Sequence, residues 1–325
     1  GSTGILPGDD MAAVRRAAEA LGFPVLIKPA GGGGGIGMVP VPDTQSLSES
    51  WERASVMAGK AFGNPALYME RFIRAPRHIE FQFLADRHGN VLSLFERDCS
   101  TQRRYQKVIE EAPAPAIDRQ AVAGMAERLS SILGEIGYDV IGTVEMLYTP
   151  DSGFSFLEVN TRLQVEHAIS EAVTGVDIVQ AQIRLAAGEK LSAVIGAQPV
   201  VTGHAIEARV YAEDPVRFLP SPGVLKTFEL PQSRPGLRIE TGYAQGNRVS
   251  SHYDPMVAKV IAHAADRGAA IRELGSALGR MRVDGIKTNI PMILQVLGSE
   301  RFQAGAMTVD GLQEVISTES AKELA

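Results

Sequence analysis

The sequence predicts an α+β fold in which antiparallel strand hairpins carry helices on one side. Residues 78–83 alternate between apolar and polar side chains, which is typical of a strand with two different faces. The turn at 86–90 and the apolar run after it complete a hairpin. A second hairpin is expected where strands 141–148 and 154–161 flank the turn 150–153. Because hairpins pair antiparallel, this pattern favours α+β over a doubly wound parallel sheet.

The remaining elements follow from capping residues, glycine stops and apolar periodicity. A capping box at Ser46–Glu49 would open the second helix, and the loosely patterned stretch 189–202 is a candidate domain boundary. In chain order we expect helix 11–22, strand 23–30, helix 46–60, strand 66–73, helices 118–136, 166–174 and 177–187, strands 203–212, 224–230 and 256–264, and helices 267–281 and 310–318.

The composition is that of an ordinary globular protein. Its 325 residues are 45% hydrophobic and 22% charged, which excludes wholesale disorder and collagen, and the length suggests about two domains. A net charge of −6 argues against a broad nucleic-acid surface, and no apolar run reaches the roughly 20 residues that a membrane span needs. Cys99, the single cysteine, cannot form an internal disulfide and fits a reducing compartment such as the cytoplasm.

The second hairpin predicts a metal site. If Thr149 and Phe154 close its loop, Glu145 lies directly opposite Glu158. Two carboxylates about 5 Å apart repel by roughly 3 kcal/mol at an effective dielectric near 20, and a divalent cation would offset this. Asn160 shares the face of Glu158, and such oxygen ligands suit Mg²⁺. The alternative is a solvated strand face with scattered acids. On either interpretation the neighbouring apolar residues face the core, namely Val144, Met146, Leu157 and Val159.

The glycine run Gly31–Gly35, with Gly37, follows an apolar strand and Lys28. Bare backbone N–H groups can surround phosphate oxygens, and glycine allows both close approach and positive φ. The spacing is not that of a P-loop, so we expect a phosphate-covering, mobile lid. The alternative is a flexible linker.

Three further clusters are ambiguous by themselves. Residues 162–167 combine a cation, an amide and a carboxylate that could hold a small anion and remove its proton, or could form a surface salt-bridge cluster. Residues 96–98 together with 102–107 could clamp an anion or form a solvated basic loop. Arg209 shares a strand face with Glu207, which indicates a local ion pair, and Lys259 follows a structural turn at the start of a strand.

Taken together, these strings resemble the biotin carboxylase family of ATP-grasp enzymes. The match runs through KPAGGGGGIGM, YMERFIRAPRHIEFQ, ERDCSTQRRYQKVIEEAPAP, FLEVNTRLQVEH, GHAIEARVYAEDP, FLPSPG, YDPMVAK and VDGIKTN. The resemblance implies an ATP-grasp domain over 1–202, whose lid subdomain is 1–75, and a biotin carboxylase C-terminal domain over 203–325.

The resemblance also implies a nucleotide and metal site. Magnesium, or manganese, would be held by Glu145, Glu158 and Asn160, in agreement with the hairpin geometry. The ATP-binding residues would be Lys28, Gly33, Gly34, Gly35, Gly37 and Met38 at the phosphates, Glu70, Arg71 and Ile73 at the adenine, and His78, Gln102 and Tyr105 nearby.

The implied reaction carboxylates biotin in two steps. Bicarbonate attacks the γ-phosphate of ATP to give carboxyphosphate, and CO₂ released from it is captured by the biotin enolate. Glu166 would be the general base that deprotonates bicarbonate, and Arg209 would stabilise the enolate. Bicarbonate would be bound by Lys107, Arg162, Gln164 and the Val165 amide. The implied partners are a biotin carboxyl carrier domain, a carboxyltransferase subunit and a second copy of the chain, paired through the C-terminal domain.

Departures from the family pattern leave alternatives open. Ile36, Tyr105 and Arg71 stand where the family usually has a basic residue, histidine and lysine. The chain starts after the position of the family's Rossmann-like N-terminal domain, which suggests a fragment or split subunit, and it has no Met-Lys-Met biotin attachment signature. A non-catalytic nucleotide-binding or assembly module is therefore the alternative to an active carboxylase. A relative of carbamoyl-phosphate synthetase is a third possibility.

Overall fold

The structure, a computed structural model, describes residues 1–31 and 37–323 and divides into two compact units, Gly1–Arg74 and Ala75–Ala325. Each unit is described by itself. Gly33, Gly34, Gly35 and Ile36 lie outside the described residues.

The first unit is a small antiparallel sheet in the strand order β2-β1-β3, covered by two helices. Its core is formed by alternate residues of β1 together with Leu47, Trp51 and Ala54 of α2. The elements are α1 (Met11–Leu21), β1 (Val25–Pro29), β2 (Val39–Val41), α2 (Thr44–Phe62) and β3 (Leu67–Arg71).

Helix α2 begins earlier than the sequence predicts. Asp43 is its N-cap and accepts a hydrogen bond from the backbone N of Ser46 at 2.9 Å. The predicted capping box at Ser46–Glu49 is therefore wrong, because an aspartate three residues upstream already satisfies the free amide of the first turn. Ser46 instead lies inside that turn and donates its own hydroxyl to Asp43.

The second unit is built on one long sheet. Its strands are β4 (Arg77–Ala85), β5 (Val91–Arg103), β6 (Gln106–Ala112), β7 (Val140–Thr149), β8 (Gly153–Asn160), β9 (His204–Tyr211), β10 (Gly223–Val224), β11 (Thr227–Glu229), β12 (Leu237–Glu240), β13 (Arg248–Val249), β14 (Met256–Ala264) and β15 (Arg282–Asp284). Its helices are α3 (Arg119–Glu135), α4 (His167–Thr174), α5 (Ile178–Ala186), α6 (Leu191–Ile195), α7 (Arg267–Gly279), α8 (Ile290–Gly298), α9 (Glu300–Gln303) and α10 (Gly311–Glu323).

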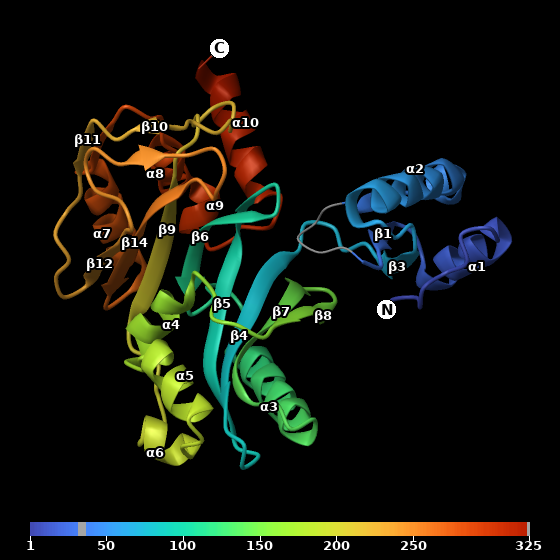
Figure 1. The fold of residues 1–325 in the computed structure, drawn as a ribbon, viewed down its shortest axis with the longest axis horizontal. Coiled ribbons are helices and arrows are strands. Elements are labelled where there is room, and N and C mark those ends of the chain that lie inside the picture. The colour runs from blue at the N-terminus through green and yellow to red at the C-terminus, as the bar shows by residue number, and fades with distance from the viewer. Residues whose placement is uncertain (32–36, 324–325) are drawn as a thin grey trace. The chain divides into compact units, whose positions relative to one another are not determined.

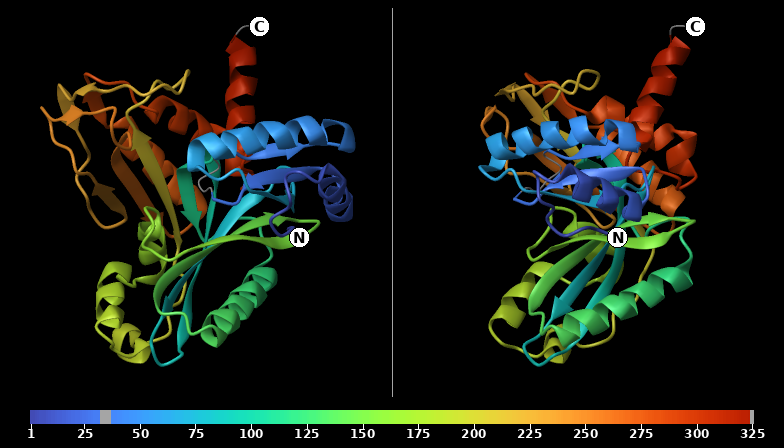
Figure 2. Two further views of the ribbon diagram at one scale, coloured as in Figure 1. Left: turned by 45° about the vertical axis from the view of Figure 1, so that its right-hand side comes forward. Right: turned by 90° about the vertical axis from the view of Figure 1, so that its right-hand side faces the viewer.

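Eight of these strands pair antiparallel in the order β12-β14-β9-β6-β5-β4-β7-β8 (Figure 1). The predicted placement of helices on one side is wrong. Phe83 packs with α3, while its neighbour Leu84 packs with α5 and α6, and successive residues of a strand point to opposite faces. Helices therefore cover both faces, as Figure 2 shows for α3 and α5.

Residues 102–107, read from the sequence as an anion clamp or a basic loop, belong to a hairpin. β5 runs to Arg103, β6 starts at Gln106, and Arg104 and Tyr105 form the turn between them with φ of 49° and 68°. A two-residue turn with positive φ at both positions matches the right-handed twist of the flanking strands. The short turn keeps Lys107 inside the sheet, opposite Gln102.

The hairpin of β7 and β8 confirms the predicted pairing of Glu145 with Glu158, although its turn differs. Thr149 pairs with Gly153 instead of Phe154, and a bulge between Glu145 and Met146 restores the register. Val159, predicted to face the core, is 37% exposed, because β8 is the last strand of the sheet and has no strand beyond it.

The candidate boundary at 189–202 contains the short helix α6. The sheet is continuous beyond it, since β9 pairs with β6, and the division of 1–202 from 203–325 stays a prediction. None of the helices within 1–31 and 37–323 combines the length and the apolar character that crossing a bilayer requires.

Candidate active site

The face of β4 opposite α3 carries three buried polar side chains, His78, Glu80 and Gln82. The alternation predicted for 78–83 is confirmed, and its polar half points into the protein. Burying a carboxylate requires charged or hydrogen-bonding partners, because the loss of hydration costs several kcal/mol. The partners come from β5 and β7, which lie on either side of β4 in the sheet, from β6, which lies beyond β5, and from the loop before α4.

Arg97 of β5 is the first of these partners and has no exposed surface. Its Nε donates to Glu80 Oε1 at 2.7 Å, and its Nη1 donates to Gln82 Oε1 at 2.8 Å. It also donates to Ser170 Oγ at 2.9 Å and to Gln164 Oε1 at 2.8 Å. The planar guanidinium thereby links β4 to α4 and to the loop that precedes α4.

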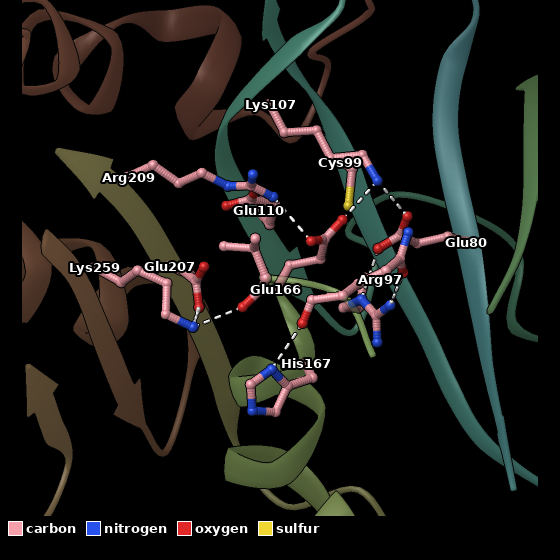
Figure 3. A network of polar contacts seen from close by, with 12 residues as sticks. Glu80, Arg97, Cys99, Lys107, Glu110, Glu166, His167, Glu207, Arg209 and Lys259 are labelled. Atoms are coloured by element: carbon pink, nitrogen blue, oxygen red, sulfur yellow. Dashed lines mark hydrogen bonds and ion pairs between the residues drawn. The ribbon is translucent and has the colours of Figure 1, made fainter. Parts of the chain in front are cut away.

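Lys107 of β6 lies at the centre of three carboxylates, of which Glu80 and Glu166 are labelled in Figure 3. Its Nζ is 2.6 Å from Glu80 Oε2, 3.0 Å from Glu145 Oε1 and 2.6 Å from Glu166 Oε1. Burial lowers the pKa of Lys107, but these carboxylates, Glu80 foremost, raise it well above its usual range. Burial likewise raises the pKa of Glu80, and the charges of Lys107 and Arg97 outweigh it and lower that pKa to about 2.

Glu166 joins Lys107 to a second cation. It immediately precedes α4, and its Oε2 accepts from Arg209 Nη2 of β9 at 2.9 Å, while Arg209 Nη2 also lies 2.5 Å from Glu110 Oε1. The expected local ion pair of Arg209 with Glu207 is therefore replaced by pairs across the sheet. Glu110 and Glu207 oppose each other on β6 and β9.

Both of these opposed carboxyls hold protons more tightly than usual. Burial raises the pKa of Glu110 to about 7 against the opposing effect of Arg209. Burial and the neighbouring Glu110 raise the pKa of Glu207 to about 8. The pair therefore binds more protons near neutral pH than two exposed carboxyls would.

Two of the predicted metal ligands, Glu145 and Glu158, are paired across β7 and β8 at the end of the sheet. Glu145 is buried and accepts from Gln164 Nε2 at 2.8 Å, and its Oε2 lies 3.0 Å from His78 Nε2. Burial raises the pKa of Glu145, but His78 and Lys107 lower it well below its usual range. Glu158 is exposed and accepts from Asn160 Nδ2 at 3.3 Å. A buried and an exposed carboxylate with an amide oxygen form a donor set that fits a hydrated Mg²⁺.

The predicted bicarbonate ligands are brought together in part. Lys107 and Gln164 both contact Glu145 Oε1, whereas Arg162 is exposed and donates to Asn160 Oδ1 at 3.0 Å. The carbonyl of Val165 accepts from Lys259 Nζ at 2.6 Å.

The predicted nucleotide ligands lie in both units. Gln102 Nε2 is 2.7 Å from His78 Nδ1, so these two are neighbours, while Tyr105 is 62% exposed at its turn. In the first unit Lys28 Nζ donates to Glu70 Oε2 at 3.1 Å. Burial lowers the pKa of Lys28, and Glu70 more than offsets this, so that the pKa is raised. Arg71 is exposed and Ile73 partly buried, and Gly37, next to Met38, has a φ of 79°.

Comparisons with known proteins decide the family. The family model described as carbamoyl-phosphate synthase L chain, ATP binding domain, matches residues 2–194, and that of the biotin carboxylase C-terminal domain matches 207–314. Biotin carboxylases of Halalkalibacterium halodurans and Pseudomonas aeruginosa are 45% and 46% identical, over 94% and 97% of this chain and 68% and 69% of their own. The chain belongs to the biotin carboxylase family.

Solved biotin carboxylase structures have the same α+β ATP-grasp fold. The biotin carboxylase domain of Hydrogenobacter thermophilus 2-oxoglutarate carboxylase, a dimer with MgADP, ADP and bicarbonate, gives a TM-score of 0.90 at 38% identity over 96% of this chain and 69% of that one. Campylobacter jejuni biotin carboxylase, in a beta-gamma-ATP complex, gives 0.88 at 39% identity over 93% and 67%. The expected fold class is confirmed.

Several charged residues of this biotin carboxylase site were missed by the sequence reasoning. Glu80 and Glu110 received no role, Arg97 was considered only as part of a possible anion clamp, Glu207 only as the ion-pair partner of Arg209, and Lys259 only at the start of a strand. The alternation at 78–83 already placed Glu80 beside His78 and Gln82 on one face. A face with three polar residues inside an otherwise apolar strand was the available signal.

Proposed function

We propose that this chain carboxylates biotin on a carrier domain, using ATP and bicarbonate, through carboxyphosphate. The observation that carries the proposal is the position of Glu166 between Lys107 and Arg209. A carboxylate held between two cations can take a proton from a small acid bound beside it, and the cations stabilise the anion that results.

The contacts of Lys107 indicate where bicarbonate enters. Each of its three carboxylate partners also has a second polar contact, Glu80 with Arg97, Glu145 with Gln164 and Glu166 with Arg209. An anion that binds Lys107 would compete with these carboxylates and would lie next to Glu166.

Glu145, Glu158 and Asn160 would hold Mg²⁺, which when bound neutralises charge on the ATP phosphates. Lys107, Gln164 and the Val165 amide position bicarbonate, with Arg162 completing the set. Lys28, the glycine loop to Gly37, Glu70, His78 and Gln102 are assigned to the nucleotide. Phosphoryl transfer depends mainly on such positioning and charge neutralisation, so this residue set suits the reaction.

The partners are proposed on the same basis. The rat mitochondrial relative, 44% identical over 90% of this chain and 41% of its own length, is the alpha subunit of a methylcrotonoyl-CoA carboxylase. We expect a biotin carrier domain, a carboxyltransferase subunit and a homodimer through the C-terminal part, in the cytoplasm. Light scattering of the purified chain checks the dimer, and a concentration-independent monomer would contradict it.

The test measures ATP cleavage with bicarbonate and free biotin. We expect Glu166→Gln to lower the bicarbonate-dependent rate at least about 100-fold, the usual loss for a missing general base. Glu189→Gln, which alters an exposed ion pair with Arg184, is the matched control and should leave the rate unchanged. Nucleotide binding without cleavage by the unaltered chain would favour the non-catalytic module, and ammonia-dependent carbamoyl phosphate formation would favour the synthetase alternative.

A further inference from the structure

A square of four ionisable side chains lies behind the site, on the face of the sheet where β6, β9 and β14 adjoin. Glu110 and Glu207 oppose each other on β6 and β9, and Arg209 and Lys259 oppose each other on β9 and β14. Like charges directly opposite destabilise a sheet, so a structure that keeps two such pairs needs a compensating arrangement. Each cation is accordingly near a carboxylate, with Arg209 beside Glu110 and Lys259 beside Glu207.

The ammonium group of Lys259 contacts a backbone carbonyl as well as carboxylates. Its shortest contact is to the Val165 carbonyl at 2.6 Å, followed by Glu240 Oε2 at 2.9 Å, and Glu207 Oε2 is more distant at 3.5 Å. If neutralising Glu207 were the whole role of Lys259, the carboxylate would be its nearest partner. The lysine side chain is almost fully buried, so the contact with Val165 is shielded from water.

Two neighbouring positions of the loop before α4 are thus tied to two neighbouring cations of the sheet. Arg209 binds the Glu166 side chain (Figure 3), and Lys259 binds the Val165 carbonyl. That carbonyl carbon is bonded to the Glu166 nitrogen, and the peptide unit is planar. An ammonium that holds the carbonyl oxygen therefore fixes the plane from which Glu166 extends.

We propose that Lys259 is a positioning residue that holds the Val165–Glu166 peptide unit and so aims Glu166 at the position between Lys107 and Arg209. This role rests on the proposed function of Glu166 as the general base. A small misplacement of a catalytic group can cost about 100-fold in rate, so the effect of losing the ammonium is measurable.

The first experiment compares Lys259→Met with the unaltered 325-residue chain. We expect kcat/KM for bicarbonate to fall roughly 10- to 100-fold while the KM for ATP changes less than about twofold. Hydrogen exchange of peptides that cover 160–168 should accelerate, while exchange in α3 stays the same. Lys287→Met, which removes an exposed lysine paired with Asp214, is the matched control and should change neither quantity. Unchanged exchange over 160–168 in Lys259→Met would overturn the proposal.

A second variant separates positioning from charge balance. Lys259→Met removes the cation that faces the buried Glu207, so Lys259→Met combined with Glu207→Gln also removes the ionisable group that this cation faces. We expect the double variant to keep the fast exchange over 160–168 and the low kcat/KM. Recovery of unaltered exchange and kcat/KM would show that Lys259 only balances charge. Because the exchange measurement needs no turnover, absence of bicarbonate-dependent cleavage in the unaltered chain would count against the proposed function alone.

Discussion

At the scale of single residues, Arg97 shows how a charge can be buried completely. Its guanidinium reaches Glu80, Gln82, Ser170 and Gln164, so its N–H groups find acceptors inside the protein. Lysine could not replace it, because its compact ammonium group lacks the planar, forked arrangement of N–H donors that reaches all four partners at once. Arg97 orients Gln164 toward Glu145 and Glu80 toward Lys107, and so acts on the site through other residues.

We expect Arg97→Met to lower the free energy of unfolding by about 3–5 kcal/mol, because it leaves the buried Glu80 with one cation fewer. Arg87→Met, which breaks the exposed pair with Asp139, is the control and should cost less than about 1 kcal/mol. Urea unfolding measures both values. A loss below about 1 kcal/mol for Arg97→Met would mean that Lys107 alone suffices to hold Glu80.

Glu158 differs from Glu145 because it is exposed and contacts Asn160, outside the buried charge network. We expect Glu158→Gln to change the free energy of unfolding by no more than about 0.5 kcal/mol, the usual range for a surface substitution. The Mg²⁺ concentration needed for half-maximal ATP cleavage should nevertheless rise about tenfold, since one ligand loses its charge. An unchanged Mg²⁺ requirement would remove Glu158 from the metal site.

At the scale of elements, short turns set the register of the strands that carry the site. Arg104 and Tyr105 have positive φ, which costs ordinary residues roughly 1 kcal/mol or more each. The turn persists because the pairing of β5 with β6 is held by long strands on both sides. This pairing places Lys107 opposite Gln102 and in reach of Glu80 on β4.

We expect the double substitution Arg104→Asn and Tyr105→Gly to raise the free energy of unfolding by about 0.5–1 kcal/mol, because Asn-Gly is the preferred pair for such a turn. Both side chains are exposed, so little packing is lost. Thermal unfolding checks the stability. If stability rises and the KM for ATP also increases, Tyr105 belongs to the nucleotide site. A lower stability would contradict the backbone strain assigned to the positive φ angles of Arg104 and Tyr105.

At the scale of the whole second unit, the interior is a network of alternating charge. Carboxylates outnumber cations in it, since Glu80, Glu110, Glu145, Glu166 and Glu207 face Arg97, Lys107, Arg209 and Lys259. The raised pKa values of Glu110 and Glu207 reduce this excess of negative charge by retaining protons. The network is thereby close to neutral at physiological pH.

The stability of the fold should therefore fall as pH rises from about 4.5 to about 8 and should level off above that range. The folded pKa values of Glu110 and Glu207 are about 7 and about 8, above the unfolded value of 4.5, so the folded state binds more protons across this window. The contribution of these two groups to the free energy of unfolding is complete below the unfolded pKa and disappears as pH rises to the folded pKa values. The loss is up to about 1.4 kcal/mol per pH unit for each proton. Urea unfolding across this range measures the slope.

Glu207→Gln removes one of the two carboxyls that titrate in this window. The ionisable groups that face Glu207 are Glu110, Lys259, Arg209 and Glu166. We expect the substitution to reduce the loss of stability between about pH 4.5 and 8 by about half, because one of two protons no longer dissociates. An unchanged slope would show that Glu207 is already ionised at the acidic end of this window.

Local patterns in the sequence were enough to predict which side chains share a strand face and which carboxylates pair at the predicted metal site. Alternation at 78–83 placed Glu80 beside His78. Counting residues back from the predicted turn of the second hairpin correctly placed Glu145 opposite Glu158, even though the turn itself is displaced by one residue. A bulge in the hairpin compensates for the displaced turn, because it adds one residue to one strand. The alternation of apolar and polar residues along a strand does not reveal such a bulge.

The sequence by itself determined which side chains share a face, because that depends only on the residue spacing within one strand. The tertiary structure decided which faces meet. Arg97 and Ser170 are 73 residues apart in the chain, and Lys259 and Val165 are 94 apart. Such contacts depend on the order of strands across the sheet, here β14-β9-β6-β5-β4, and on the path of the loop before α4. That order follows from the packing of the whole core, so no local pattern encodes it.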